Sequence, residues 1–216
     1  DIYGNKKLQY LFTTEKHMHI IDRNGDYVPN FPIELPDKVS AEISVYDYDK
    51  NSNYRIFVPC QNRKVYLYNQ EGKQIEGWPI TTREPVITPI QHFRIKENEY
   101  LVCSDNLKTY ILNRRGEVRI NVTTNFSKAK NTLFYVDYSD GDDDPKFITT
   151  TSSGEIVRIS MNGACQISTI RKNYSAEHYF EFTDINGDGK MEYIFTDQSQ
   201  LAPSAYSAVC GLFRPL

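Results

Sequence analysis

Residues 63–80 read RKVYLYNQEGKQIEGWPI, and this stretch decides the fold. A run rich in valine, leucine and tyrosine leads into a polar turn that contains Gly72, and a second run leads away from it. Glycine adopts the positive φ that tight hairpin turns require at little cost. The stretch therefore predicts a β-hairpin with Gly72 in its turn.

The same hairpin pattern recurs along the whole chain. Its copies read HIIDRNGDYV, YLYNQEGKQI, YILNRRGEVR and RISMNGACQI, around Gly25, Gly72, Gly116 and Gly163. Successive glycines lie 47, 44 and 47 residues apart. Self-similarity at a fixed period of this size indicates a β-propeller or another array of repeats.

Each repeat contains further short runs that predict strands. In residues 41–80 the expected strands are Ala41–Asp47, Tyr54–Pro59, Lys64–Asn69 and Gln74–Pro79. Four antiparallel strands in a unit of this length make one propeller blade. A single blade cannot bury both of its faces, but it can do so between neighbouring blades. We therefore predict an all-β propeller of four-stranded antiparallel blades, either a fragment or a small ring.

The chain begins and ends inside a repeat. Residues 1–14, DIYGNKKLQYLFTT, align with residues 184–197, DINGDGKMEYIFTD, four repeats later. We expect a partial blade over 1–40, complete blades over 41–80, 86–122 and 131–171, and a partial blade over 177–197. Residues 198–216 read as an atypical tail without a third strand. A closed ring would place Glu177–Thr183 beside the first blade, whereas an open arc would expose apolar blade faces and self-associate.

Composition excludes several classes of protein. The net charge is −3, the mean hydropathy is −0.56, and aromatic residues make up 13% of the chain. The apolar runs are too short to span a bilayer, so we expect no transmembrane segment. Charges of both signs are interspersed, so we expect no nucleic-acid partner. Residues 125–131, NFSKAKN, read as a connector between blades.

One segment carries a metal-binding pattern. Oxygen-bearing side chains stand at positions 1, 3, 5 and 9 of residues 184–192, a glycine stands at position 6, and position 7 can offer its backbone carbonyl. Calcium takes six to eight oxygen ligands, and this spacing wraps a loop around one ion. The alternative is a solvated turn, because Asp, Asn and Gly favour turns by themselves. The predicted ligands of one structural calcium ion are Asp184, Asn186, Asp188, Lys190 and Glu192.

The cognate loops of the other repeats are poorer matches. Residues 47–55 keep oxygens at positions 1, 3 and 5 but have Arg55 at position 9. Residues 137–144 are acidic but one residue out of step, the loop near His92 and Arg94 has lost the pattern, and residues 1–5 are a decayed copy. We therefore expect calcium in one loop only, where it braces a turn and does no chemistry.

No catalytic set is visible in the sequence. His17 and His19 lie two apart on a predicted strand and so share a face, which we interpret as a polar strand face rather than a metal site. Four scattered histidines and the absence of a G-x-S-x-G elbow give no support to a nucleophile. Cys60 and Cys103 occupy nearly the same place in consecutive blades, and we expect semi-buried thiols in preference to a disulfide.

Two motifs suggest a family. The loop Asp184–Glu192 followed by Tyr-Ile-Phe resembles the FG-GAP/VCBS repeat of integrin-type propellers and bacterial surface proteins. The phrase Gly77-Trp-Pro-Ile80 also resembles those repeats and the quinoprotein-dehydrogenase-like (PQQ-like) propellers. The resemblance covers residues 1–197 and implies a propeller with calcium at the same five residues. Because Trp78 is the only tryptophan, the tryptophan-docking pattern of quinoprotein enzymes is missing.

Three functions remain compatible with the sequence. We expect a non-enzymatic propeller that is secreted, periplasmic or on the cell surface and binds an unknown protein or glycan partner. The alternatives are a propeller enzyme of lyase or quinoprotein type with a channel site, and a structural spacer. A binding module should show an exposed aromatic patch, an enzyme should gather charged residues in its channel, and a spacer should show neither.

Overall fold

The structure is a computed structural model that describes residues 1–170, 174–197 and 211–213. These residues form strands, turns and bends, and none of their segments is a helix of the length and apolarity that crossing a membrane requires. The chain forms two compact units, Asp1–Asn106 with Leu112–Arg119, and Leu107–Ile111 with Ile120–Leu216.

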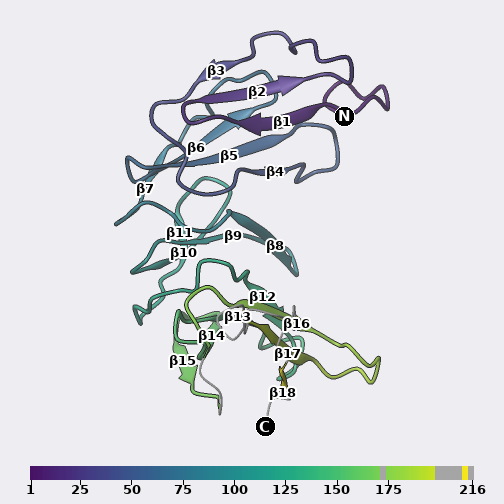
Figure 1. Ribbon diagram of the computed structural model, residues 1–216. Helices are drawn as coiled ribbons and strands as arrows, with labels where there is room; N and C mark the ends of the chain where they lie inside the picture. The colour runs from purple at the N-terminus through teal and green to yellow at the C-terminus, as the bar shows by residue number, and fades with distance from the viewer. Residues whose placement is uncertain (171–173, 198–210, 214–216) are drawn as a thin grey trace, which may run out of the picture. The chain divides into compact units, whose positions relative to one another are not determined.

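The first unit holds two whole sheets, and their strands follow one another in chain order (Figure 1). One sheet consists of β1 (Tyr10–Thr13), β2 (His17–Ile21) and β3 (Ile33–Glu34). The other consists of β4 (Ser44–Tyr46), β5 (Arg55–Cys60), β6 (Lys64–Asn69) and β7 (Ile80–Thr81). A third sheet has the order β11-β10-β9-β8, with strands β8 (Gln91–Ile95), β9 (Asn98–Ser104), β10 (Thr109–Leu112) and β11 (Val118–Ile120).

The second unit holds two further sheets. One consists of β12 (Tyr135–Asp137), β13 (Lys146–Thr150), β14 (Ile156–Ser160) and β15 (Cys165–Ser168). The other consists of β16 (Tyr179–Thr183), β17 (Glu192–Thr196) and β18 (Gly211–Phe213). Strand β18 pairs with β17, with Phe213 opposite Tyr193. The expectation that the tail lacks a third strand is therefore wrong, because a strand needs only backbone groups in register and not the glycine hairpin.

Every described strand pair whose register is known is antiparallel, and three of the sheets have four strands. The predicted fold class, all-β with four-stranded antiparallel blades, is confirmed. The turns explain the pattern. The hairpin glycines all have φ between +80° and +91°, and each amide donates to the carbonyl three residues earlier at 2.9–3.1 Å, on Asp22, Asn69, Asn113 and Ser160.

Packing also requires these glycines. A Cβ added to Gly72 would lie 3.0 Å from Cγ2 of Ile33, which belongs to the preceding sheet. A Cβ on Gly116 would lie 2.6 Å from Cγ2 of Ile80. The hairpin glycines Gly72 and Gly116 thus each lie against an isoleucine of the sheet before them. A side chain at Gly116 would force that isoleucine to move, and one at Gly72 would crowd it. Around Gly25 the same position is open, with no atom within 4 Å.

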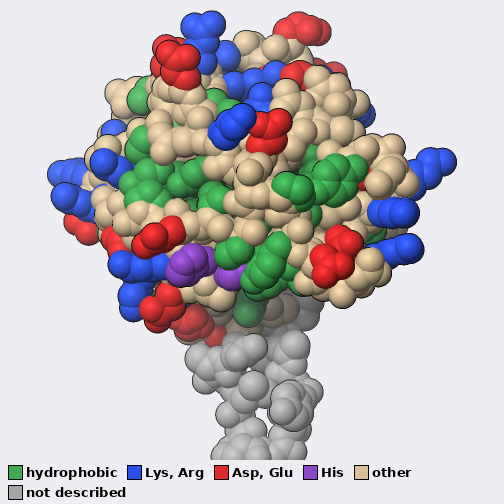
Figure 2. Space-filling model, turned by 90° about the horizontal axis from the view of Figure 1, so that it is seen from above, with side chains coloured by type: hydrophobic (Ala, Val, Ile, Leu, Met, Phe, Trp, Pro, Cys, Tyr) green, Lys and Arg blue, Asp and Glu red, His purple; other side chains and the backbone are tan. Residues whose placement is uncertain are grey.

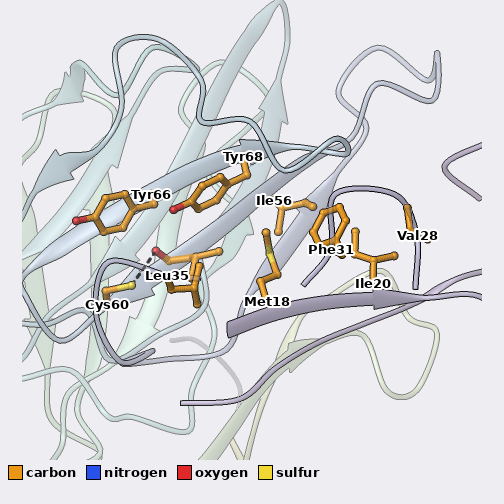
Figure 3. Close-up of a cluster of buried hydrophobic side chains, with 10 residues drawn as sticks. Met18, Ile20, Val28, Phe31, Leu35, Ile56, Cys60, Tyr66 and Tyr68 are labelled. Carbon is orange, nitrogen blue, oxygen red and sulfur yellow. Dashed lines mark hydrogen bonds between the residues drawn. The ribbon is translucent and has the colours of Figure 1, made fainter. Parts of the chain in front are cut away.

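Neighbouring sheets share one core within each unit. In the first unit Met18 and Ile20 of β2 pack on Ile56 of β5, together with the two tyrosines of β6 (Figure 3). Methionine and isoleucine on alternate positions of β2 thereby point to the same side and pack on the next sheet. In the second unit, four aromatic side chains of β16 and β17 pack against Ile148 and Ile156, namely Phe180, Phe182, Tyr193 and Phe195.

Candidate functional site

The predicted calcium loop connects β16 to β17, and its first aspartate organises the turn. Asp184 Oδ1 accepts hydrogen bonds from the amides of Gly187 at 2.7 Å and Asp188 at 3.2 Å, and Oδ2 accepts one from Gly189 at 2.7 Å. Gly187 and Gly189 have φ of +74° and +80°. One carboxylate therefore caps three consecutive amides, and the two glycines allow the chain to wrap around it.

The other predicted ligands lie on the same turn. Asn186 Oδ1 accepts the amide of Asp188 at 2.9 Å, and Asp188 Oδ1 accepts the amide of Lys190 at 2.9 Å. Glu192, at the start of β17, is 1% exposed, and its Oε2 accepts the amide of Ile185 at 3.1 Å. The structure thus brings the four oxygen-bearing side chains onto one turn, and they are the hard donors that suit calcium.

Calcium binding at this turn stays a prediction. Within the described part of the chain, no three His, Cys, Asp or Glu side chains form a ready metal-binding group. The three predicted carboxylates, Asp184, Asp188 and Glu192, are thus not gathered into such a group in this structure. The other two predicted ligands are the amide oxygen of Asn186 and the carbonyl of Lys190. Backbone amides already donate to both oxygens of Asp184 and to Oδ1 of Asp188, so ion binding depends on the lone pairs that these hydrogen bonds leave free.

The loop of residues 47–55 has the same backbone. Asp47 Oδ1 accepts the amide of Asn51 at 3.1 Å, and Oδ2 accepts that of Ser52 at 2.8 Å. Lys50 and Ser52 have φ of +53° and +63°, at the positions of Gly187 and Gly189. At position 9, where residues 184–192 carry a glutamate, Arg55 donates to the side-chain oxygen of Asn53.

Residues 1–9 are a third copy that sequence reasoning undervalued. Asp1 Oδ1 accepts the amide of Asn5 at 3.1 Å, and Gly4 and Lys6 have φ of +64° and +62°. Gln9 Oε1 accepts the amide of Ile2 at 2.9 Å, which reproduces the contact between Glu192 and Ile185. The signal was present in the sequence, because glutamine is the neutral counterpart of glutamate at position 9.

A neighbouring lysine offsets part of the negative charge of the acidic loop of residues 137–144. Lys146 pairs with Asp140, and its Nζ lies 2.9 Å from Asp144 Oδ2. The hydrogen bond and charge of Lys146 hold the pKa of the Asp140 carboxyl below its usual range. Two of the aspartates in this loop thus form ion pairs with Lys146, two residues beyond its end.

An ion-pair network lies near His92 and Arg94, where the loop has lost the metal-binding pattern, and no sequence motif predicts it. Glu99 contacts both His92 and Arg94, and its Oε1 lies 3.0 Å from a guanidinium nitrogen of Arg114. Arg114 also pairs with Asp49 at 3.0 Å. Burial alone would raise the pKa of Glu99, but the hydrogen bonds from His92 and Arg94 and the charge of Arg114 outweigh it and lower that pKa. A shallow depression of about 420 Å³ lies beside the network.

The two histidines of β2 lie on an exposed aromatic face, which we define as Tyr10, Phe12, His17, His19 and Tyr27. Phe12 and His19 are direct cross-strand partners, and their rings stack 4.8 Å apart. His19 Nδ1 lies 3.1 Å from the Tyr27 hydroxyl, and Nε2 lies 3.2 Å from the hydroxyl of Thr14. Because both ring nitrogens of His19 have hydrogen-bond partners, the arrangement favours a polar strand face over a metal site.

This face is open to solvent. Tyr10, Phe12 and Tyr27 are 62%, 42% and 52% exposed. Figure 2 shows hydrophobic and histidine side chains side by side on this side of the molecule. Monomeric proteins seldom leave contiguous aromatic surface exposed without a use for it.

A buried lysine is the other feature that sequence reasoning missed. Lys128 lies in the expected connector and is 2% exposed; its Nζ lies 2.7 Å from Thr132 Oγ1, 3.1 Å from the carbonyl of Ala129 and 5.0 Å from the centre of the Phe134 ring. Burial lowers its pKa to about 7. His178, fully buried, lies 2.9 Å from Thr150 Oγ1 through Nε2, and burial lowers its pKa too.

The described cysteines are free thiols. Cys60 and Cys103 are buried and unpaired with each other, and Cys165 is half-buried. The preference for thiols over a disulfide is confirmed, but the expectation that Cys60 and Cys103 are semi-buried is wrong, because they are 0% and 1% exposed. Burial raises the pKa of Cys60 to about 11 and that of Cys103 to about 12, so neither is a thiolate near neutral pH. Cys210 lies outside the described residues.

Comparisons with known proteins place the fold. No protein-family model and no curated protein matches this sequence. The Vibrio cholerae biofilm matrix protein Bap1 matches with a TM-score of 0.60 and 12% identity over 91% of this chain and 33% of its own. BBS1N, in its complex with ARL6DN, matches with a TM-score of 0.57 and 14% identity, over 91% of this chain and 58% of its own.

The computationally designed Ika4 protein matches with a TM-score of 0.53 and 9% identity, over 83% of this chain and 92% of its own. This chain therefore spans a little over half the length of BBS1N and most of the length of Ika4. At such identities the likeness concerns the fold alone, and it agrees with the sheets described above. The chain has a fold of the β-propeller class.

Proposed function

We propose that this chain is a non-enzymatic β-propeller module that binds a protein or glycan partner outside the cytoplasm, on a cell surface, in the periplasm or after secretion. The exposed aromatic face of β1 and β2 carries the proposal, because an exposed aromatic patch is the feature that separates a binding module from a spacer. Aromatic rings supply large contact areas at low conformational cost and dominate the energetics of many interfaces.

The face is also preorganised. The Phe12 ring stacks on His19, and two hydroxyls hold the imidazole from both sides, on Thr14 and Tyr27. Side chains that are already ordered lose less entropy when a partner binds. Two of the matching structures are those of the biofilm matrix protein Bap1 and of BBS1N in its complex with ARL6DN, and they support a binding role for this fold.

We further propose that the repeats of this chain are of the FG-GAP/VCBS type and that the loop of residues 184–192 binds one calcium ion. It is supported by the donor set of that loop and by its glycine-dependent turn. The ion would brace the connection between β16 and β17 and would supply no chemistry. By analogy with bacterial surface proteins of that type, we place this module in a calcium-rich extracellular environment.

Site-specific crosslinking tests the binding role. A photocrosslinking amino acid at position 12 should trap a partner from the secreted and surface fractions of the source organism. The same group at position 118, where the valine of β11 is 63% exposed, should trap nothing. On a glycan array, Phe12→Ala should lose signals that Val118→Ala retains. Equal crosslinking from both positions, or no loss in Phe12→Ala, would contradict a binding role for the aromatic face.

A further inference from the structure

The aromatic face has a covered equivalent in the next sheet. With residues 1–9 and 47–55 in register, Tyr10 corresponds to Ile56 and Phe12 to Val58. Ile56 and Val58 are 1% and 0% exposed, because they lie in the core cluster that includes Met18 and Ile20. The repeat therefore shows what normally covers this face, namely the opposite face of a neighbouring sheet.

The hairpin of the first sheet is also uncovered, at Gly25. Gly72 lies against Ile33 and Gly116 against Ile80, each from the sheet before. Gly25 occupies the same place in its own hairpin, with the same sign of φ, and has open space instead. Two separate positions of the first sheet thus have the shape of an interface, and the described residues leave both uncovered.

The terminal sheet, β16-β17-β18, has a face equivalent to the one that the first sheet packs on its neighbour, which we call the covering face. With residues 1–9 and 184–192 in register, Ile194 corresponds to Leu11, which packs on the core cluster together with Met18 and Ile20. Cross-strand pairing places Glu181 opposite Ile194 and Tyr179 opposite Thr196, so these residues share one side of the sheet. Tyr179 is 48% exposed and Ile194 is half-buried.

We propose that the aromatic face takes the terminal sheet of a second copy of this chain, through Tyr179 and Ile194, so that copies associate head to tail. The inference rests on the binding role proposed above for the same face, and it names the partner. Each copy carries one face of each kind, so the contact is heterologous and links two different surfaces.

Sedimentation velocity of the full 216-residue chain over a concentration series tests the proposal. The mass of the parent should rise with concentration. Phe12→Asp removes the aromatic face and Tyr179→Asp removes the covering face, so each variant alone should stay monomeric. Val118→Asp, which changes an exposed valine of β11, should associate like the parent. Circular dichroism melting curves should show that all variants are folded.

A mixture of the two face variants gives the sharpest result. Phe12→Asp retains the covering face and Tyr179→Asp retains the aromatic face, so an equimolar mixture should form a heterodimer and nothing larger. A monomeric parent at several hundred micromolar, self-association of Tyr179→Asp, or a mixture that stays monomeric would each overturn the proposal. If the parent is monomeric but position 12 still crosslinks to a foreign protein, the binding role stands and the second copy is excluded.

Discussion

The loops of residues 184–192 and 47–55 have one backbone and different chemistry. In both, an aspartate at position 1 caps the amides at positions 5 and 6, and residues at positions 4 and 6 have positive φ. They differ at position 9, where one has Glu192 and the other has Arg55. The turn is therefore formed in both loops by side-chain hydrogen bonds to the backbone, and the two loops differ in the charge of the residue at position 9.

The loop of residues 47–55 uses cations that belong to the protein. Arg114 pairs with Asp49, the position 3 residue, and its guanidinium lies over the Tyr48 ring at 4.3 Å. Arg55 donates to Asn53 within the loop. The loop of residues 184–192 instead carries a buried carboxylate at position 9, Glu192, which is the arrangement that suits an ion from solution.

The largest expected difference between the two loops is the stabilisation of the folded chain by calcium. Added calcium should stabilise the parent by about 2.7 kcal/mol at a concentration one hundred times its dissociation constant. Asp188→Ala should abolish the gain, because it removes a ligand, while the equivalent change Asn51→Ala should leave it intact. Thermal unfolding in calcium and in EDTA measures both. Equal calcium shifts in Asp188→Ala and the parent would reduce residues 184–192 to a turn.

A single change should make the loops alike. Arg55→Glu places a carboxylate at position 9 beside Asp47 and Asp49, so it should create a second calcium site. Without calcium the added negative charge should cost about 1 kcal/mol of stability, which calcium restores. Titration calorimetry should give two ions per chain instead of one. Arg55→Gln is the control and should keep one; a single ion in Arg55→Glu would show that position 9 does not decide binding.

The shared φ values should also be measurable. Gly189→Ala should destabilise the chain by about 1 kcal/mol through backbone strain alone, because no atom lies within 4 Å of the added Cβ. Ser52→Gly should stabilise it by about 0.5 kcal/mol, since the left-handed strain there outweighs the added chain entropy. Urea unfolding measures both. Opposite signs would show that the two backbones differ in solution.

The smallest expected effect comes from Glu99, which forms an ion pair with Arg114, the residue that also pairs with Asp49 of the loop of residues 47–55. The folded-state pKa of Glu99 lies below its ordinary value of 4.5, so its ion pairs stabilise the fold above that pH and are lost as the pH falls through the folded pKa. Glu99→Gln should cost about 0.5 kcal/mol at pH 7 and nothing near pH 2. Its calcium response should match the parent. A cost that persists in acid would mean a packing role.

Local patterns were readable from the sequence because short-range rules produce them. The hairpin glycines, the strand order of each blade and the shape of residues 184–192 all depend on residues within one turn or one strand pair. The loop of residues 1–9 also follows from a local pattern, because Gln9 stands at the position of Glu192 in the aligned repeats. The predicted blade boundaries, ring closure and location outside the cytoplasm stay predictions.

Long-range polar contacts were not readable. Arg114 meets Asp49 across 65 residues of chain, and no periodicity specifies which charges of neighbouring blades will pair. Lys128 lies in a polar connector that reads as solvent-exposed, yet threonine and carbonyl oxygens surround its amine. Burial of one lysine in a loop depends on the sheets that flank it, which a local pattern does not describe.

The contact between hairpin glycine and preceding isoleucine has a consequence for how such chains grow by gene duplication. In the second sheet, Gly72 packs against Ile33 of the first sheet, and Ile80 packs against Gly116 of the third sheet. The repeat of residues 41–80 therefore encodes both halves of the joint, a glycine for its predecessor and an isoleucine for its successor. A tandem duplication of a single repeat inserts a unit whose two sides already fit, and a deletion of one repeat brings together two sides that also fit. Blade number can thus change in evolution without any compensating mutation at the joints.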